Sequence, residues 1–323
     1  MIYVQKFLFL LWTVFLVCGL ELHAQTYPNK PLRLIAPLPV GSATDTVARI
    51  LAIELSANLK QNILVDNKVG ADGAIAASEV SHAAPDGYTL LFGTNSPMAA
   101  VPALRKTPPY DPIKDFTPIT LIGRYSSFLW VNAKLPIANL ADFIAFAKAN
   151  PNKLNYATGN TGGIVAMAQT LSLAGNLKLV HVPYKGEPAA LIDLVSNNIQ
   201  VMFATPTTAQ AYAREGKLKV LATTLPQRSP GAPEVPTMAE AGLPKFSISL
   251  WAALYGPPGM PQAIVDQLAK EMGQVLSRSD VRDKLEAQQF FVQGSTPKEL
   301  EIFTAEQLQV YARTLREAGV QAE

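Results

Sequence analysis

Short apolar runs bounded by turn residues alternate with amphipathic segments from Tyr27 onward. Residues 140–149 predict a helix because their apolar residues recur at helical spacing. A series of such strand–helix units favours an α/β fold with parallel sheets covered by helices. Beyond residue 262 the pattern is helical only, and Thr296 to Glu299 form a capping box. Strands are predicted at 32–36, 62–65, 89–92, 117–122, 127–131, 154–157, 177–182, 200–203, 218–222 and 248–254.

One strand–turn–helix unit has the arrangement that holds anions in many proteins. An apolar run over residues 32–38 is followed by a turn of small residues at 39–43, and Thr44 and Asp45 open the helix. The first N–H groups of a helix have no partner within the helix, and they carry partial positive charge. This turn therefore predicts a site for a carboxylate or another anion.

Residues 154–174 show the same strand–turn–helix pattern, with a short strand, a turn of small polar residues at 158–163 and a helix that has an apolar stripe. The repetition suggests two similar lobes, each of which offers one helix N-terminus. The turn hydroxyls of Ser42, Thr44, Thr158 and Thr161 could donate to carboxylate oxygens. Either turn alone is better explained by a tight turn and helix capping, whereas two matching turns favour a ligand.

The first two dozen residues are typical of a secretory signal peptide over residues 1–24. Lys6 precedes an apolar run at 7–20, and small residues end at Ala24. The run is shorter than the roughly 20 residues of a spanning helix, which argues against the alternative of an uncleaved membrane anchor. Cys18, the only cysteine, follows Val17, so lipid attachment is not favoured. The pattern predicts export to the periplasm.

Composition and motifs argue against nucleic-acid binding and against catalysis. The net charge of +2 is too small for a nucleic-acid footprint, and 49% hydrophobic residues indicate a folded protein. After signal removal only His82 and His181 remain, in unrelated contexts, and no nucleophile elbow or Walker loop occurs. We therefore predict no catalytic residue, no metal and no cofactor.

Two charged residues near the predicted turns have two interpretations each. Asp45 would repel an anion unless it faces away, and in the first helical turn it complements the helix dipole. Lys185 follows a strand and could reach an anion, although a solvated surface lysine fits the sequence equally well.

Several segments resemble the substrate-binding proteins of tripartite tricarboxylate transporters, the Bug receptors. The resemblance runs from about Tyr27 to the C-terminus, and it is carried by "YPNKPLRLIAPLPVGSATDTVAR", "APDGYTLL", "YDPIKDFTPITLIG" and "VPYKG". It implies an α/β, two-lobed periplasmic binding protein fold (Venus flytrap, type II-like) with hinge strands. The Pro-rich segments at 105–119 and 225–236 are candidate places where the chain crosses from one lobe to the other. We expect lobe 1 at 25–123 plus 225–323, and lobe 2 at 124–224.

The resemblance also implies that the lobes clasp a small carboxylate and that integral membrane subunits of the transporter receive it. We expect a monomer. The expected ligand-binding residues are Pro39, Val40, Gly41, Ser42, Ala43, Thr44, Asp45, Thr94, Asn95, Thr158, Gly159, Asn160, Thr161, Gly162, Gly163, Tyr184, Lys185, Ala204 and Thr205.

Two departures from the family pattern concern the ligand. Val40 and Ser42 stand where the family more often has smaller residues, and Ala204 stands where relatives that bind amino acids have an acid. Loss of that acid favours a mono- or dicarboxylate without an amine. Four aromatic residues could flank the cleft for an aromatic acid, or could pack in the core instead: Tyr125, Tyr156, Tyr184 and Trp251.

Two other functions remain open at this point. An exported hydrolase is disfavoured because no nucleophile–base set is present. A receptor that signals to a membrane kinase would use the same clasp, and the sequence does not separate it from a transport receptor.

Overall fold

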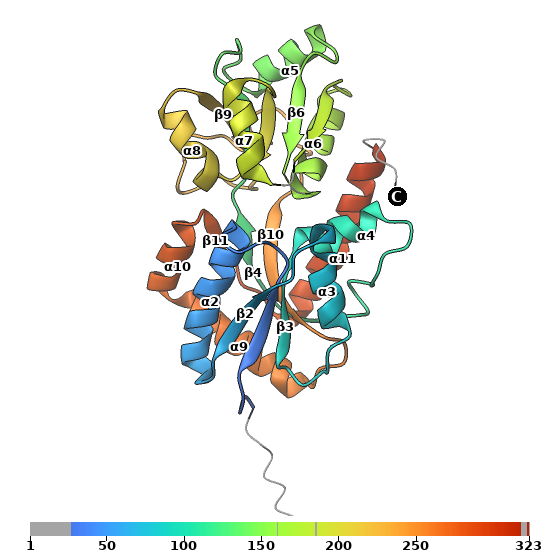
Figure 1. The fold of residues 1–323 in the computed structure, drawn as a ribbon, viewed down its shortest axis with the longest axis vertical. Helices are drawn as coiled ribbons and strands as arrows, with labels where there is room; N and C mark the ends of the chain where they lie inside the picture. Colours follow the sequence, from blue (N-terminus) through green and yellow to red (C-terminus); the bar gives the residue numbers. More distant parts are fainter. Residues whose placement is uncertain (1–26, 160, 185, 318–321, 323) are drawn as a thin grey trace, which may run out of the picture.

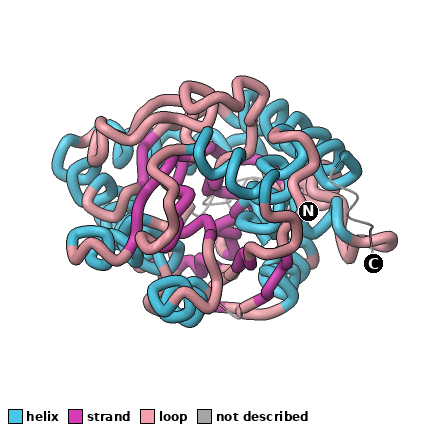
Figure 2. The backbone as a smooth tube through the Cα atoms, turned by 90° about the horizontal axis from the view of Figure 1, so that it is seen from above, coloured by secondary structure: helices cyan, strands magenta, loops and turns pink. Residues whose placement is uncertain are grey.

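A computed structural model describes residues 27–323 except 160, 185, 318–321 and 323. The predicted signal peptide lies outside these described residues. The chain forms two α/β lobes stacked along the long axis of the molecule, with connecting segments between them (Figure 1). Seen from above, helices and loops lie around the strands (Figure 2).

The first lobe is built on a six-stranded mixed sheet in the order β11-β4-β10-β3-β1-β2. β1 pairs in parallel with β2 and β3, whereas β10 is antiparallel to β3 and β4, and β11 is antiparallel to β4. Its strands are β1 (Leu32–Ala36), β2 (Ile63–Asn67), β3 (Thr89–Thr94), β4 (Thr117–Tyr125), β10 (Leu250–Gly256) and β11 (Phe290–Val292).

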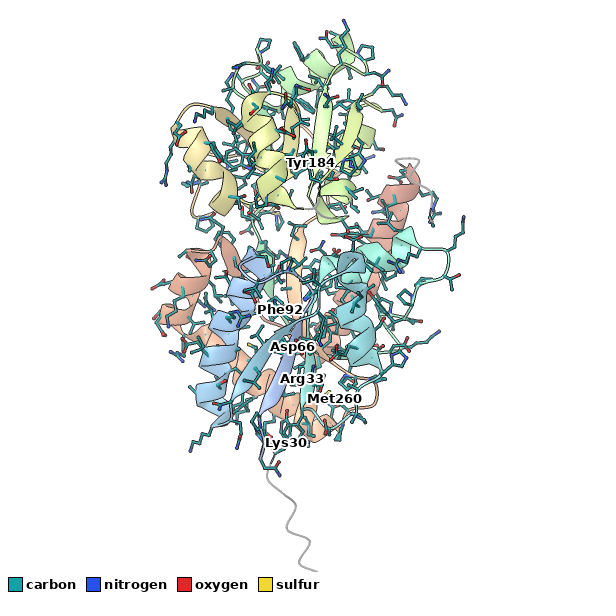
Figure 3. All side chains as sticks on the ribbon, viewed as in Figure 1. Lys30, Arg33, Asp66, Phe92, Tyr184 and Met260 are labelled. Carbon is teal, nitrogen blue, oxygen red and sulfur yellow. The ribbon has the colours of Figure 1, made fainter. Side chains whose placement is uncertain are left out.

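Helices cover both faces of this sheet, and therefore its central strands are apolar on both sides. On one face lie α2 (Ala43–Leu59), α9 (Gln262–Ser277) and α10 (Ser279–Glu286). The other elements are η1 (Ala71–Gly73), α3 (Ala74–Ser81), η2 (Ser96–Ala100), α4 (Val101–Leu104) and α11 (Pro297–Glu317). Phe92 lies fully buried between the elements of this lobe (Figure 3).

The second lobe contains a five-stranded sheet in the order β7-β6-β8-β5-β9. The buried side chains of Phe128, Trp130 and Met202 form one of its cores together with apolar residues of α7. Its elements are β5 (Phe128–Asn132), α5 (Leu140–Ala149), β6 (Asn155–Thr158), α6 (Thr161–Leu173), β7 (Val180–Pro183), α7 (Glu187–Ser196), β8 (Val201–Ala204), α8 (Pro206–Arg214) and β9 (Leu218–Thr223).

The structure confirms the predicted α/β fold but corrects the prediction of parallel sheets. Strands of the βα units run toward the space between the lobes, whereas β5 and β10 enter their sheets from the connecting segments and therefore run the opposite way. The prediction of an all-helical tail beyond residue 262 was also wrong, because β11 pairs with β4 at the edge of the sheet, with Phe290 opposite Tyr125. Three residues are too few to show a strand period.

The capping box that precedes α11 is confirmed. The main-chain N of Thr296 donates to Glu299 over 2.7 Å, and the Glu299 N donates to the Thr296 hydroxyl over 3.2 Å. The two bonds satisfy donors that the first helical turn would otherwise leave without partners.

The connections between the sheets position the site. β4 continues to Tyr125, and Ser126 and Ser127 lead directly into β5. After β9 the chain stays with the second lobe, where the Thr223 N donates to the Pro236 carbonyl over 2.8 Å. The chain then returns to the first lobe as β10. We expected the lobe limits at 123/124 and 224/225. In the structure the first passage lies between Tyr125 and Phe128, and the second lies between Thr223, the end of β9, and Leu250, the start of β10.

Candidate functional site

The turn between β1 and α2 has the predicted form of a capped helix start. Ser42 is the N-cap of α2, and its hydroxyl accepts a hydrogen bond from the Asp45 N over 3.2 Å. Gly41 has a φ of 80°, a conformation that favours glycine. Val40 is 72% exposed at the tip of the turn, whereas Thr44 is buried.

Asp45 is committed to the structure of this turn. Its carboxylate accepts hydrogen bonds from the Gly41 N over 2.9 Å, from Arg49 Nε over 3.0 Å and from Asn67 Nδ2 over 2.9 Å. Burial by itself raises the pKa of Asp45, but these hydrogen bonds and the Arg49 charge outweigh it and lower the pKa. Asp45 therefore shapes the loop and is neutralised by Arg49, so it does not oppose an anion at the turn.

Thr94 and Asn95, at the end of β3, are both buried. The Asn95 side chain accepts a hydrogen bond from the Trp251 N over 3.4 Å and so links β3 to β10. Of the four predicted cleft aromatics, Tyr125 and Trp251 are buried in the core.

The second turn joins β6 to α6. The Thr158 hydroxyl lies 2.7 Å from His181 Nε2, and His181 stacks on Tyr156 with 4.8 Å between ring centroids. Burial lowers the pKa of His181. Asn160 lies outside the described residues. Thr161 is 1% exposed, and its hydroxyl has no hydrogen-bond partner in the described parts of the chain.

The loop before α7 and the end of β8 complete the second lobe's side of the site. The Tyr184 hydroxyl donates to Asp193 over 2.5 Å, so this side chain is held on α7 (Figure 3). Lys185 lies outside the described residues. Ala204 is fully buried, and the N and hydroxyl of Thr205 donate to Glu187 Oε2 over 3.1 and 3.0 Å.

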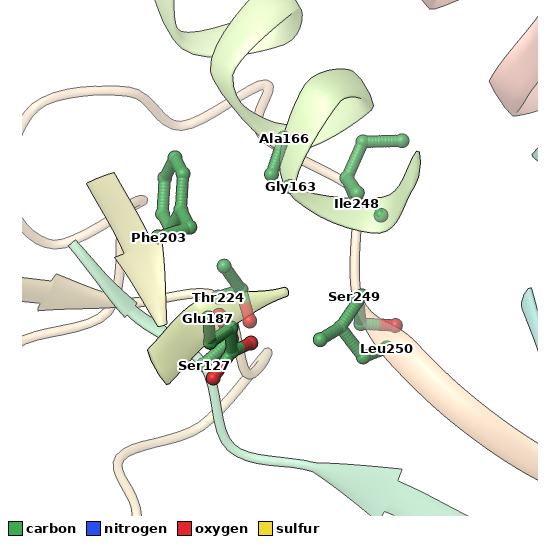
Figure 4. A pocket seen from close by; sticks show the side chains of 10 residues that line it. Ser127, Gly163, Ala166, Glu187, Phe203, Thr224, Ile248, Ser249 and Leu250 are labelled. Atoms are coloured by element: carbon green, nitrogen blue, oxygen red, sulfur yellow. The ribbon is translucent and has the colours of Figure 1, made fainter. Parts of the chain in front are cut away.

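A small cavity of about 10 Å³ lies where the two lobes meet the connecting strands (Figure 4). This volume is about the least that can hold one water molecule. Of the predicted site residues only Gly162 and Gly163 line it, and the turn at 39–45 does not. The lining residues are Ser127, Gly162, Gly163, Ala166, Glu187, Phe203, Thr224, Ile248, Ser249 and Leu250.

Sequence reasoning missed most residues of this cavity. Ser127, Thr224 and Ser249 belong to the connecting segments, and their only signal is a polar residue beside the end of an apolar run. Glu187 directly follows the "VPYKG" segment, but nothing in the sequence placed it at the site. Its carboxylate puts negative charge at the cavity.

Two further features of the described residues concern metal-binding clusters and membrane-spanning helices. No group of three or more His, Cys, Asp or Glu side chains within them could hold a metal ion. In the same described ranges, no helix is long and apolar enough to cross a membrane.

Comparisons with known proteins agree with this geometry. A family model described as "Tripartite tricarboxylate transporter family receptor" matches residues 47–320. Protein BugT of Bordetella pertussis is 33% identical over 298 residues, covering 92% of this chain and 91% of BugT.

Two solved structures of Rhodopseudomonas palustris proteins show the same fold. Rpa4515 with adipate has a TM-score of 0.83 and 29% identity, covering 92% of this chain and 100% of the solved chain. MatC with bound malate has a TM-score of 0.78 and 32% identity, covering 90% and 100%.

Proposed function

Because this chain belongs to the tripartite tricarboxylate transporter receptor family, we propose that it captures a small organic carboxylate between its lobes and delivers it to membrane subunits of a tripartite transporter. In this proposal the chain acts in the periplasm as a monomer after cleavage at residue 24. Lobe 1 comprises the chain up to β4 and from β10 onward, and lobe 2 comprises β5 to β9 with the segment that follows β9.

The observation that carries the proposal is the pair of turns at the N-termini of α2 and α6. Each helix begins at the end of its lobe that faces the other lobe (Figure 1). Main-chain N–H groups at such ends favour negative charge without any cationic side chain. A carboxylate held by both turns interacts more strongly with the closed arrangement of the lobes, and it therefore shifts the population toward closure.

The ligand in this proposal carries no amine. Relatives solved with adipate and malate hold acids without an amine, and Ala204 replaces the acid that would pair with one. Glu187 lines the cavity together with Gly162 and Gly163 of the second turn, so a carboxylate held at that turn has to lie on the side away from the Glu187 carboxylate. The cavity of about 10 Å³ by itself is too small for such an acid, so the proposed site extends beyond it to the turn at 39–45.

A thermal-shift panel on residues 25–323 tests the proposal. The panel contains C4–C6 diacids including malate and adipate, citrate, benzoate and phthalate, with neutral sugars as controls. A ligand at 100 times its Kd stabilises a folded protein by about 2.7 kcal/mol, which raises Tm by several degrees. A shift with at least one carboxylate and with no sugar is expected. Stabilisation by a neutral sugar and by no carboxylate would contradict the proposal.

A further inference from the structure

A second, larger cavity of about 310 Å³ lies beside the connecting strands. Thr224 and Ser249 line both this cavity and the small cavity between the lobes, so the two cavities share part of their walls. We call the larger one the rear cavity. Its volume is in the range of small-molecule pockets. It is lined by Arg124, Thr224, Leu225, Pro226, Met238, Ala239, Phe246, Ser247, Ser249 and Gln307.

Arg124 supplies the only formal charge in this lining. Its Nε donates to Gln293 over 3.0 Å, its Nη1 donates to Ser249, and its guanidinium lies 5.0 Å from the ring centre of Phe303. Across the described residues, no carboxylate forms an ion pair with Arg124, and no hydrogen bond from its Nη2 is found. A half-buried cation without a counter-charge is costly, and a carboxylate on the Nη2 side would relieve that cost.

The remaining lining suits the body of a small organic acid. Thr224 and Gln307 are 4% and 8% exposed, and each has a buried oxygen without a hydrogen-bond partner in the described chain. The Gln307 amide can present either its oxygen or its nitrogen by turning about its last torsion. Leu225, Met238 and Phe246 provide apolar surface. Desolvation of Arg124 lowers its pKa, as expected for a guanidinium that has left water without gaining an acidic partner.

We propose that the rear cavity is a second binding site, which takes a small monocarboxylate with an apolar body. The carboxylate pairs with Arg124, and the apolar part lies against Met238 and Phe246. Arg124 and Gln307 belong to elements of the first lobe, whereas Thr224 and Met238 belong to the segment that stays with the second lobe. Occupancy therefore favours one arrangement of the lobes and is coupled to ligand capture in the cleft.

Isothermal titration calorimetry with benzoate and with hexanoate tests this site, and benzamide serves as the uncharged control. Ala239→Trp places a ring in the rear cavity from an exposed residue, so the fold should persist, and Ala239→Ser is its matched control. Arg124→Gln removes the charge. Thr161→Val changes the cleft between the lobes instead, so it distinguishes binding in the cleft from binding in the rear cavity.

The expected result is a binding event for benzoate or hexanoate that Thr161→Val and Ala239→Ser retain. Ala239→Trp and Arg124→Gln should each weaken it at least tenfold, and benzamide should not bind. Two results would overturn the proposal. One is that neither acid binds the wild-type protein. The other is that binding persists unchanged in Ala239→Trp, which would place the acid in the cleft. If only Thr161→Val loses malate or adipate binding, that result concerns the site in the cleft and agrees with a separate site in the rear cavity.

Discussion

Replacing Thr161 with valine should change affinity and stability in opposite directions. The Thr161 hydroxyl is buried at the first turn of α6 and has no partner among the described residues. Valine has nearly the same shape, so the substitution removes an unsatisfied polar group without opening a cavity. Burying such a group without a partner costs about 1–3 kcal/mol, and therefore the variant should be as stable as the wild type or more stable by about 1 kcal/mol.

The same substitution should weaken ligand binding. A hydroxyl that donates to a carboxylate contributes about 1.5–3 kcal/mol, so its loss should raise Kd by roughly 10- to 100-fold. Thr170→Val is the matched control, because Thr170 lies on the same helix and its hydroxyl donates to the Ala166 carbonyl over 2.8 Å. Urea unfolding measures stability, and calorimetry with the acid found in the panel measures Kd. Unchanged affinity in Thr161→Val, or an equal loss in Thr170→Val, would show that the Thr161 hydroxyl does not bind the ligand.

Two further predictions concern the loops. A Cβ at Gly159 would stand 2.5 Å from the Glu187 N, so Gly159→Ala should lower the free energy of unfolding by about 1–3 kcal/mol and weaken ligand binding about tenfold. Gly273→Ala is the control, because a Cβ there meets nothing within 4 Å, and it should neither destabilise the protein nor weaken binding. Thermal shift measures the stability of both variants, and calorimetry measures their affinity. The pKa of Asp45 lies below its ordinary value, so its stabilisation is present above about pH 4 and is lost as the pH falls through the folded pKa. The stability difference between wild type and Asp45→Asn in urea titrations should therefore shrink from pH 6 to pH 3, and a constant difference would contradict this.

Elements with a clear period could be predicted from the sequence, because burial imposes the period. β1 was predicted at residues 32–36 and is confirmed there, and the predicted helix at 140–149 is α5. Strand direction could not be predicted, because it depends on which strands enter a sheet from the other lobe. β11 was missed because three residues at a sheet edge leave no pattern, although Phe290 packs on Tyr125 with 4.6 Å between ring centroids.

The site was predictable only where a turn has a composition of its own. The turns at 39–45 and 158–163 were found because small and polar residues interrupt a strand–helix unit. Thr224, Ser249 and Glu187 were not found, since they come together only when the connecting strands and α7 are placed in space. Main-chain N–H groups contribute to binding without any side-chain signature, and therefore the sequence does not name the acid.

A crystal structure of residues 25–323 with the carboxylate that gives the largest thermal shift tests the central claim most directly. We expect an acid between the lobes, with carboxylate oxygens within hydrogen-bond distance of main-chain N–H groups at 42–44 and at 161–163. An acid that contacts only one of these turns, or that binds outside the cleft altogether, would rule out capture by the two turns together.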